Sequence, residues 1–288
     1  MPIRCTGSAS VRDNQVRAAN RMSKRKTIMA DPPGEPREKI WEREERSHDS
    51  GELDRESAAP HYMSRSIRRA VVDHRNVVLG APEGSRVLEI GCGKGDNLLR
   101  FLEAGIDMVG IDISSQSILL AQEKLRAAGF DPKAVMHANA ESLSFPESSF
   151  DIICGAAILH HLADLSQAGE HVHRMLRPGG RCVFLEPLGY NPGASLYRRF
   201  TPASRTADEH PLRRSDLAAF TAPFSGHKLN FYHLCGLAAS AAFLITRSTA
   251  LFRMLDAVAY PLDRLLLAVP GPTKYLAYIT VLQAWKQQ

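Results

Sequence analysis

The stretch Arg86–Asn97, RVLEIGCGKGDN, decides the fold of this chain. An apolar run, Val87–Ile90, ends in a turn with glycines at positions 91, 93 and 95, and a helical pattern of apolar residues begins directly behind it. Glycines let the backbone approach a ligand closely, and the first N–H groups of the helix point into the turn. The stretch therefore predicts a strand, a tight turn and a helix that can hold a nucleotide-like ligand, with the carboxylate of Glu89 beside it.

A second acidic strand end follows this turn. Val109–Ser114, VGIDIS, is a short strand pattern that places Asp112 roughly 20 residues after the glycines, where a carboxylate can accept both hydroxyls of a ribose. Glycines alone are a weak signal, and the position of the third glycine in a dinucleotide-binding G-x-G-x-x-G turn holds Asp96. The spacing suits NAD and S-adenosylmethionine equally.

Strand and helix patterns alternate through the middle of the chain. Ser114 can cap a helix that runs through Ala128 and ends at Gly129. Further apolar strand patterns cover residues 134–138, 150–154 and 180–185. This alternation predicts an α/β fold whose parallel sheet is covered on both faces and binds ligands at the carboxyl ends of its strands.

These motifs, in this order and spacing, resemble the class I S-adenosylmethionine-dependent methyltransferases, in particular the small-molecule group that includes the ubiquinone- and menaquinone-type enzymes. The resembling stretches are E-I-G-C-G-K-G, G-I-D-I-S, A-N-A-E-S-L-S-F-P-E-S-S-F-D, A-I-L-H-H-L-A-D and R-M-L-R-P-G-G. The resemblance implies a Rossmann-like fold with a seven-stranded, mostly parallel sheet and helices on both faces; the apolar pattern of the chain itself adds a helical insertion near the C-terminus. It also implies S-adenosyl-L-methionine as the cofactor.

The resemblance further implies a cofactor site made from three strand ends: Glu89, Gly91 and Gly93 for the methionine part, Asp112 for the ribose, and Ile113, Asn139 and Ala140 for the adenine. Asn139 departs from the family pattern, because many relatives have an aspartate there. Its amide oxygen can still accept a hydrogen bond from the adenine amino group, but without a charge. We expect a modest loss of affinity and no change of cofactor.

His160 and His161 follow the fourth strand pattern and are the candidate catalytic residues. An imidazole that titrates near neutrality suits the removal of a proton from a hydroxyl acceptor, and we favour His161 over His160. The alternative is that both are structural. The quinone-type O-methyltransferases keep a histidine matching His161 beside acidic metal ligands, but the neighbouring acidic position here is His160, so we expect no metal.

Composition divides the chain into regions. The net charge of +5 arises largely from basic residues near the N-terminus, so we expect residues 1–35 to be a disordered basic tail, with Met22 or Met29 as an alternative natural start. Residues 36–84 are expected to form a linker and N-terminal helices, or a lid, and residues 85–288 the catalytic domain. Five cysteines without a C-x-x-C pair argue against disulfides and zinc and favour a cytoplasmic location.

Two insertions are expected in the second half of the domain. Residues 187–225 are too long for a simple connection, and the resemblance implies that this insertion covers the acceptor. Candidate pocket residues there are Tyr190, Asn191, Tyr197, Arg205, Glu209 and His210. Residues 234–270 read as apolar helices, but polar residues, Pro261 and Asp263 interrupt the run of about 20 apolar residues that a membrane span needs. Core packing, an acceptor pocket, a dimer face and peripheral membrane contact all remain open.

The function most consistent with these patterns is O-methylation of a small, apolar or lipid-like acceptor. C-methylation of an isoprenoid or quinone-like acceptor is the alternative within the family, and an NAD-type oxidoreductase or a non-catalytic cofactor-binding protein are the alternatives outside it. A nucleic-acid partner is not expected, because no Asn/Asp-Pro-Pro-aromatic loop follows the fourth strand; Asp31–Pro33 lies ahead of the catalytic domain and has no strand before it. The acceptor, the pathway and the oligomeric state are not readable from the sequence.

Overall fold

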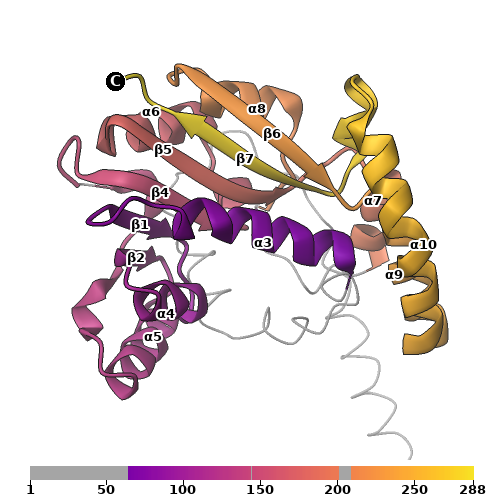
Figure 1. The fold of residues 1–288 in the computed structure, drawn as a ribbon, viewed down its shortest axis with the longest axis horizontal. Helices are drawn as coiled ribbons and strands as arrows, with labels where there is room; N and C mark the ends of the chain where they lie inside the picture. The colour runs from indigo at the N-terminus through magenta and orange to yellow at the C-terminus, as the bar shows by residue number, and fades with distance from the viewer. Residues whose placement is uncertain (1–63, 144, 201–208) are drawn as a thin grey trace, which may run out of the picture. The chain divides into compact units, whose positions relative to one another are not determined.

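The computed structural model describes residues 64–143, 145–200 and 209–288, which build one seven-stranded sheet in the order β3-β2-β1-β4-β5-β7-β6 (Figure 1). The strands are β1 (Arg86–Ile90), β2 (Asp107–Asp112), β3 (Val135–His137), β4 (Phe150–Ala156), β5 (Leu176–Pro187), β6 (Gly226–Tyr232) and β7 (Ile279–Trp285). The first five run parallel, and β7 pairs antiparallel with both β5 and β6. The expected Rossmann-like fold is confirmed.

The helices follow the alternation that the sequence predicts. They are α3 (Arg65–Leu79), α4 (Asp96–Glu103), α5 (Ser115–Ala127), α6 (Leu165–Met175), α7 (Pro192–Phe200), α8 (Arg214–Thr221), α9 (Leu237–Thr246) and α10 (Thr249–Ala268). Ser114 caps α5 by accepting a hydrogen bond from the backbone N–H of Ser117, and Gly129 behind this helix has a φ of 82°. These are the predicted start and stop signals.

The sheet is buried on both faces. Neighbouring strand residues point to opposite faces, so Val87 belongs to a core formed with α3, α4 and α5, whereas Leu88 belongs to a core formed with α6 and α8. Both side chains are fully buried. This two-sided burial explains why the parallel strands read as continuous apolar runs rather than as alternating patterns.

Several strand boundaries differ from the sequence expectation, most consequentially at β5. β5 extends to Pro187 instead of ending at residue 185, which brings the fully buried Glu186 into the sheet. The last strand, β7, begins at Ile279, after η7, a 3-10 helix over Pro272–Leu276. The expected basic tail and most of the expected linker lie outside the described residues.

The connection between β6 and β7 contains α9 and α10, which pack on each other at one end of the view in Figure 1. Tyr232, at the end of β6, and Pro187, at the end of β5, both pair with Ile279. The two helices therefore leave the sheet at the edge where the parallel strands end. Within the described part of the chain, no helix is long and apolar enough to cross a membrane.

Close packing of α6 against α8 depends on Gly169, because a Cβ there would overlap the carbonyl oxygen of Phe220. We expect Gly169→Ala to lower the free energy of unfolding by about 1 to 3 kcal/mol, the usual cost of overpacking. Ser166→Ala, at an exposed position of the same helix, should change it little. Urea denaturation of both variants tests this, and equal stability of the two would contradict the packing argument.

Candidate active site

The turn after β1 adopts the conformation that its glycines permit. Gly91 and Gly93 have φ angles of 73° and 51°, in the left-handed region that favours glycine. The backbone N–H groups of Gly91 and Cys92 donate to the carbonyl of Ile111 on β2, at 2.9 and 3.0 Å. The turn is thus tied to the neighbouring strand, and a Cβ at Gly93 would meet no atom within 4 Å, which leaves open space above the backbone.

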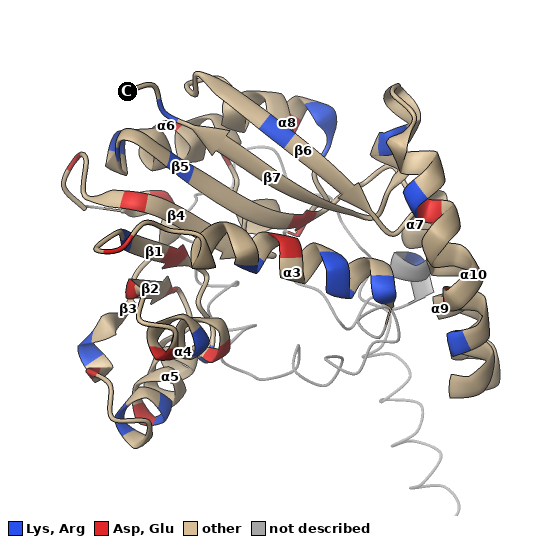
Figure 2. Cartoon of the chain, in the orientation of Figure 1, with Lys and Arg blue, Asp and Glu red and all other residues tan. Residues whose placement is uncertain are grey.

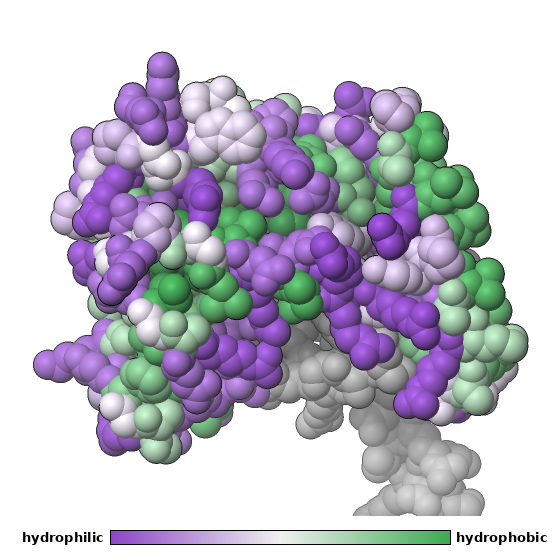
Figure 3. Space-filling view, viewed as in Figure 1, coloured by the Kyte–Doolittle hydropathy of each residue, from purple (hydrophilic) through white to green (hydrophobic). Residues whose placement is uncertain are grey.

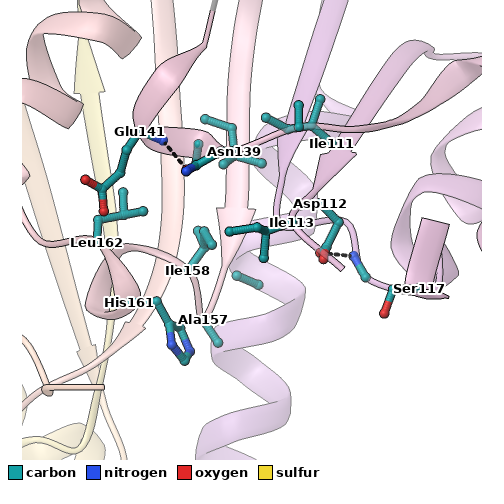
Figure 4. Close-up of a pocket in the computed structure, with 16 residues that line it drawn as sticks. Ile111, Asp112, Ile113, Ser117, Asn139, Glu141, Ala157, Ile158, His161 and Leu162 are labelled. Carbon is teal, nitrogen blue, oxygen red and sulfur yellow. Dashed lines mark hydrogen bonds between the residues drawn. The ribbon is translucent and has the colours of Figure 1, made fainter. Parts of the chain in front are cut away.

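Asp112, at the end of β2, is fixed by two backbone groups. Its Oδ2 accepts a hydrogen bond from Gly93 N–H at 2.8 Å (Figure 4), and its Oδ1 accepts one from Ser114 N–H at 2.9 Å. A carboxylate has about four lone-pair sites, so each oxygen can accept a further bond. The carboxylate is therefore held in one orientation and can still receive ligand hydroxyls.

A cavity of about 230 Å³ opens over these strand ends. It brings together seven of the residues proposed from the sequence: Gly91, Gly93, Asp112, Ile113, Asn139, Ala140 and His161. Glu89 and His160 are not among the lining residues. The apolar lining includes Ile158 and Leu162 (Figure 4), which the sequence did not single out.

Glu89 lies inside the sheet, directly before the cavity-lining Ile90, and only 2% of its surface is exposed. Burial raises the pKa of Glu89 to about 8, and the nearby charge of Asp112 adds to the rise, while a hydrogen bond with Asn97 opposes it. Its Oε2 has no hydrogen-bond partner among the described residues. A buried carboxylate oxygen without a partner is costly, so this atom is suited to meet a cationic or hydrogen-bonding group of a ligand.

Asn139 lines the cavity and also has a structural role. Its Oδ1 accepts a hydrogen bond from Glu141 N–H at 2.9 Å and so caps η4 (Ala140–Ser142), a short 3-10 helix (Figure 4). Glu141 in turn accepts from Ala163 N–H at 2.9 Å. The amide oxygen that the sequence analysis assigned to the adenine therefore has one lone pair engaged already.

The two histidines sit on η5 (Leu159–His161), the 3-10 turn that follows β4, and have different surroundings. His161 is partly buried and faces the cavity. His160 is buried behind it, and its Nδ1 lies 2.8 Å from Oε2 of Glu186. Burial, and next the neighbouring His161, lowers the pKa of His160, which the bond to Glu186 opposes.

Glu186 is a residue that the sequence analysis missed. Its Oε1 accepts hydrogen bonds from the backbone N–H groups of Ile158 and Leu159, both at 2.9 Å. The carboxylate thus positions the whole turn that carries the histidines. The available signal was an acidic residue at the end of the apolar strand VFL, since a charge buried in a sheet needs donors.

A third ligand-type side chain, Glu209 of the insertion, approaches the histidines. Its Oε1 is 4.0 Å from Nε2 of His160, and His160, His161 and Glu209 offer donor atoms that all lie within 4.8 Å of one another. Two imidazoles and one carboxylate are of the kind that binds transition metals. The expectation of no metal stays a prediction.

The other candidate pocket residues of the insertion have separate roles. Asn191 is buried and caps a helix: its Oδ1 accepts from Gly193 and Ala194 N–H, and its Nδ2 donates to Leu276 O. It is not among the lining residues of the cavity over the strand ends. The hydroxyl of Tyr190 accepts from Arg214 N–H at 3.1 Å. The backbone N–H of His210 donates to the backbone carbonyl of His160. His210 also lines a second cavity of about 450 Å³. Arg205 and the side chain of Tyr197 lie outside the described part.

Comparison with known proteins is in agreement with this geometry. Residues 88–184 match a family model described as a methyltransferase domain. The chain is 38% identical over 100 residues to the 27-O-demethylrifamycin SV methyltransferase of Amycolatopsis mediterranei, covering 34% of this chain and 37% of that protein. It is 35% identical over 128 residues to the ubiquinone/menaquinone biosynthesis C-methyltransferase UbiE of Shewanella sp. (strain W3-18-1), covering 43% and 51%.

A solved structure supports the fold. It is a S-adenosylmethionine-dependent methyltransferase, possible histamine N-methyltransferase, from Thermotoga maritima, with a TM-score of 0.54, 18% identity, and coverage of 86% of this chain and 100% of that one. The fold and the cavity define a domain of the class I methyltransferase type. Residues 88–184 thus match a methyltransferase domain, in line with the motifs, and the chain spans about half or less of the length of the two curated relatives.

The raised pKa of Glu89 predicts a proton linkage. With a pKa of about 8 in the ligand-free protein, Glu89 is mostly protonated at pH 7, and pairing with a cationic amino group favours its carboxylate form. Binding of S-adenosylhomocysteine at pH 7 should therefore release close to one proton, and affinity should rise as the pH approaches 8. Calorimetry in buffers of different ionisation enthalpy measures this release.

Glu89→Gln is the matched variant, since it keeps the shape and removes the titration. It should abolish the proton release and weaken binding by roughly ten- to a hundredfold, the range for a hydrogen bond to a charged group. A binding enthalpy that is the same in every buffer for the wild-type protein would show that Glu89 does not change its charge.

Proposed function

We propose that this protein transfers the methyl group of S-adenosylmethionine to a hydroxyl oxygen of a small, apolar or lipid-like acceptor. The observation that carries the proposal is the convergence on one cavity of the glycine turn, the fixed carboxylate of Asp112 and the imidazole of His161. The cofactor, when bound, supplies an electrophilic methyl group for in-line displacement. Side chains of this protein bind the cofactor and remove the proton of the acceptor.

The residues fit the cofactor on two observations. The Oε2 atom of Glu89, buried and without a partner among the described residues, suits a cationic amino group, and the open space over Gly93 admits a ligand close to the backbone. Asp112 keeps acceptor capacity on both oxygens for a pair of ribose hydroxyls. Positioning the reacting atoms at about 3 to 3.5 Å can contribute roughly 7 to 11 kcal/mol to the rate.

His161 is the candidate base because it lines the cavity, whereas His160 does not. Removal of the acceptor proton by a positioned imidazole typically contributes a factor of about 10² to 10⁴. Nδ1 of His160 lies 2.8 Å from Oε2 of Glu186, within hydrogen-bond distance. We therefore assign His160 a positioning role, with its ring against Glu186 and tilted by 39° to the ring of His161, at 4.3 Å between centroids.

The apolar character of the acceptor rests on the cavity wall. Ile90, Ile111, Ile158 and Leu162 line the cavity together with small alanines, and such a surface favours an apolar ligand over a sugar or an amino acid. The relative named as a C-methyltransferase supports C-methylation of an isoprenoid or quinone-like acceptor as the second candidate. Mass spectrometry with NMR of the methylated product distinguishes transfer to oxygen from transfer to carbon.

The cofactor assignment is tested by binding. We expect the protein to bind S-adenosylhomocysteine and not NAD in calorimetry, and Asp112→Ala to weaken binding by at least roughly tenfold, since charged hydrogen bonds are lost. Asp107→Ala, at the exposed start of the same strand, is the control and should bind normally. Binding of NAD in place of S-adenosylhomocysteine would overturn the proposal, and normal binding by Asp112→Ala would remove this residue from the site.

The base assignment is tested by single-turnover kinetics with a substrate found among phenols, quinols and prenyl alcohols. His161→Ala should slow methyl transfer by at least about a hundredfold, with recovery at high pH and unchanged affinity for the cofactor. Glu186→Gln, which disturbs only the positioning of the turn, should slow transfer less and without recovery at high pH. Small and equal losses in the His160 and His161 variants would leave positioning alone as the mechanism.

A further inference from the structure

Helix α10 carries an exposed apolar face. Met254, Val258, Leu262, Leu265, Leu266 and Val269 recur mostly at spacings of three or four residues, which places them on one side of the helix, and all are exposed. Leu265 is 67% exposed, and Ile245 on the neighbouring α9 is 84% exposed. Figure 3 shows this apolar surface over the helices at one end of the molecule. We call these seven residues the α9–α10 face.

The charges exposed around this face have one sign. Between Leu217 and Gln288 the sequence contains only two acidic residues, Asp256 and Asp263, and both are buried. Arg247, Arg253 and Arg264 are exposed on the same two helices and the turn between them, as the blue segments on α10 in Figure 2 illustrate. Every exposed formal charge of α9, α10 and their connecting turn is therefore positive.

The buried acids fix the orientation of α10. Asp256 accepts hydrogen bonds from Ser64 Oγ at 2.8 Å and from Arg65 N–H at 3.2 Å, and Asp263 accepts one from Ser66 Oγ at 2.8 Å. Both aspartates thus point to the first turn of α3. Since this polar side is bound to the body of the domain, α10 cannot turn its apolar face inward without breaking these bonds.

The face also lies on the functional side of the sheet. The connection that holds α9 and α10 leaves the sheet beside the end of β5, and the cavity opens at the ends of the neighbouring parallel strands, at Asp112 of β2 and Ala156 of β4. In addition, α9 packs against α7, which directly follows β5. A surface bound to the α9–α10 face would therefore lie at the edge of the sheet where the cavity opens.

We propose that the α9–α10 face docks on an anionic lipid surface. A helix with an exposed apolar side and arginines beside it lies in the plane of a membrane interface, with the apolar side chains at the headgroup–acyl boundary. The arginines supply the attraction to lipid phosphates and other anionic headgroups. Charge complementarity favours this partner over a second copy of the chain, because two such faces would bring like charges together. The inference does not rest on the proposed methyl transfer.

Co-sedimentation with vesicles tests the docking. The full chain should bind vesicles of phosphatidylcholine mixed with phosphatidylglycerol, and much less those of phosphatidylcholine alone; binding to the mixed vesicles should fall as salt screens the charges. Val258→Asp combined with Leu265→Asp should reduce binding at least tenfold, and Arg253→Glu combined with Arg264→Glu should remove the preference for anionic lipid. Leu119→Asp, at a 61% exposed position of α5, is the matched control and should bind like the wild type.

The outcomes separate folding, function and docking. Each variant should keep the S-adenosylhomocysteine affinity of the wild type, which shows that the domain is folded whatever the acceptor proves to be. Failure of the wild type to bind anionic vesicles would overturn the proposal. A dimer in sedimentation velocity that Val258→Asp with Leu265→Asp converts to a monomer, without vesicle binding, would assign the face to self-association instead.

Discussion

The hydrogen bond from Gly93 N–H to the carboxylate of Asp112 joins the turn after β1 to the end of β2, and the site depends on it. It can form because Gly91 and Gly93 adopt positive φ angles and because Gly110 of β2 has no Cβ, which would collide with Leu98 and Cys92. The floor of the cavity can therefore form because glycines let two strand ends and a helix approach one another closely. Side chains with a Cβ at these positions would separate them.

Two buried glutamates, Glu89 and Glu186, have different surroundings and different roles. Glu186 is fully buried, but two backbone N–H groups and His160 surround its oxygens, so its hydrogen-bonding capacity is satisfied within the fold. Glu89 is buried almost as deeply, yet one of its oxygens lacks a partner among the described residues and its pKa is raised to about 8. The carboxylate oxygen of Glu89 without a partner is typical of a ligand-binding group, whereas the fully hydrogen-bonded carboxylate of Glu186 is typical of a structural role.

The sequence predicted the features that are local along the chain. The strand, the glycine turn and the cap at Ser114 depend on neighbouring residues, and their spacing alone placed Asp112 beside the turn. The contact of Glu186 with His160 could not be predicted in this way, because it depends on the register between β4 and β5 and on the true length of β5. Likewise, whether a polar residue such as Asn191 lines a pocket or caps a helix depends on groups distant in the chain, here Leu276 O.

On the surface too, the exposed character of helix α10 depends on contacts with residues distant in the chain. Asp263 interrupts its apolar pattern and was one reason to reject a membrane span, but in the fold Asp256 and Asp263 are not surface charges, because they accept hydrogen bonds from the start of α3. A surface helix normally turns its apolar side to the core and its polar side to water, and α10 partly reverses this arrangement. Because Asp256 and Asp263 are buried, the exposed side of α10 is more apolar and more basic than the composition of the helix suggests. The hydrogen bonds that anchor the helix are therefore also what give its exposed face a single sign of charge.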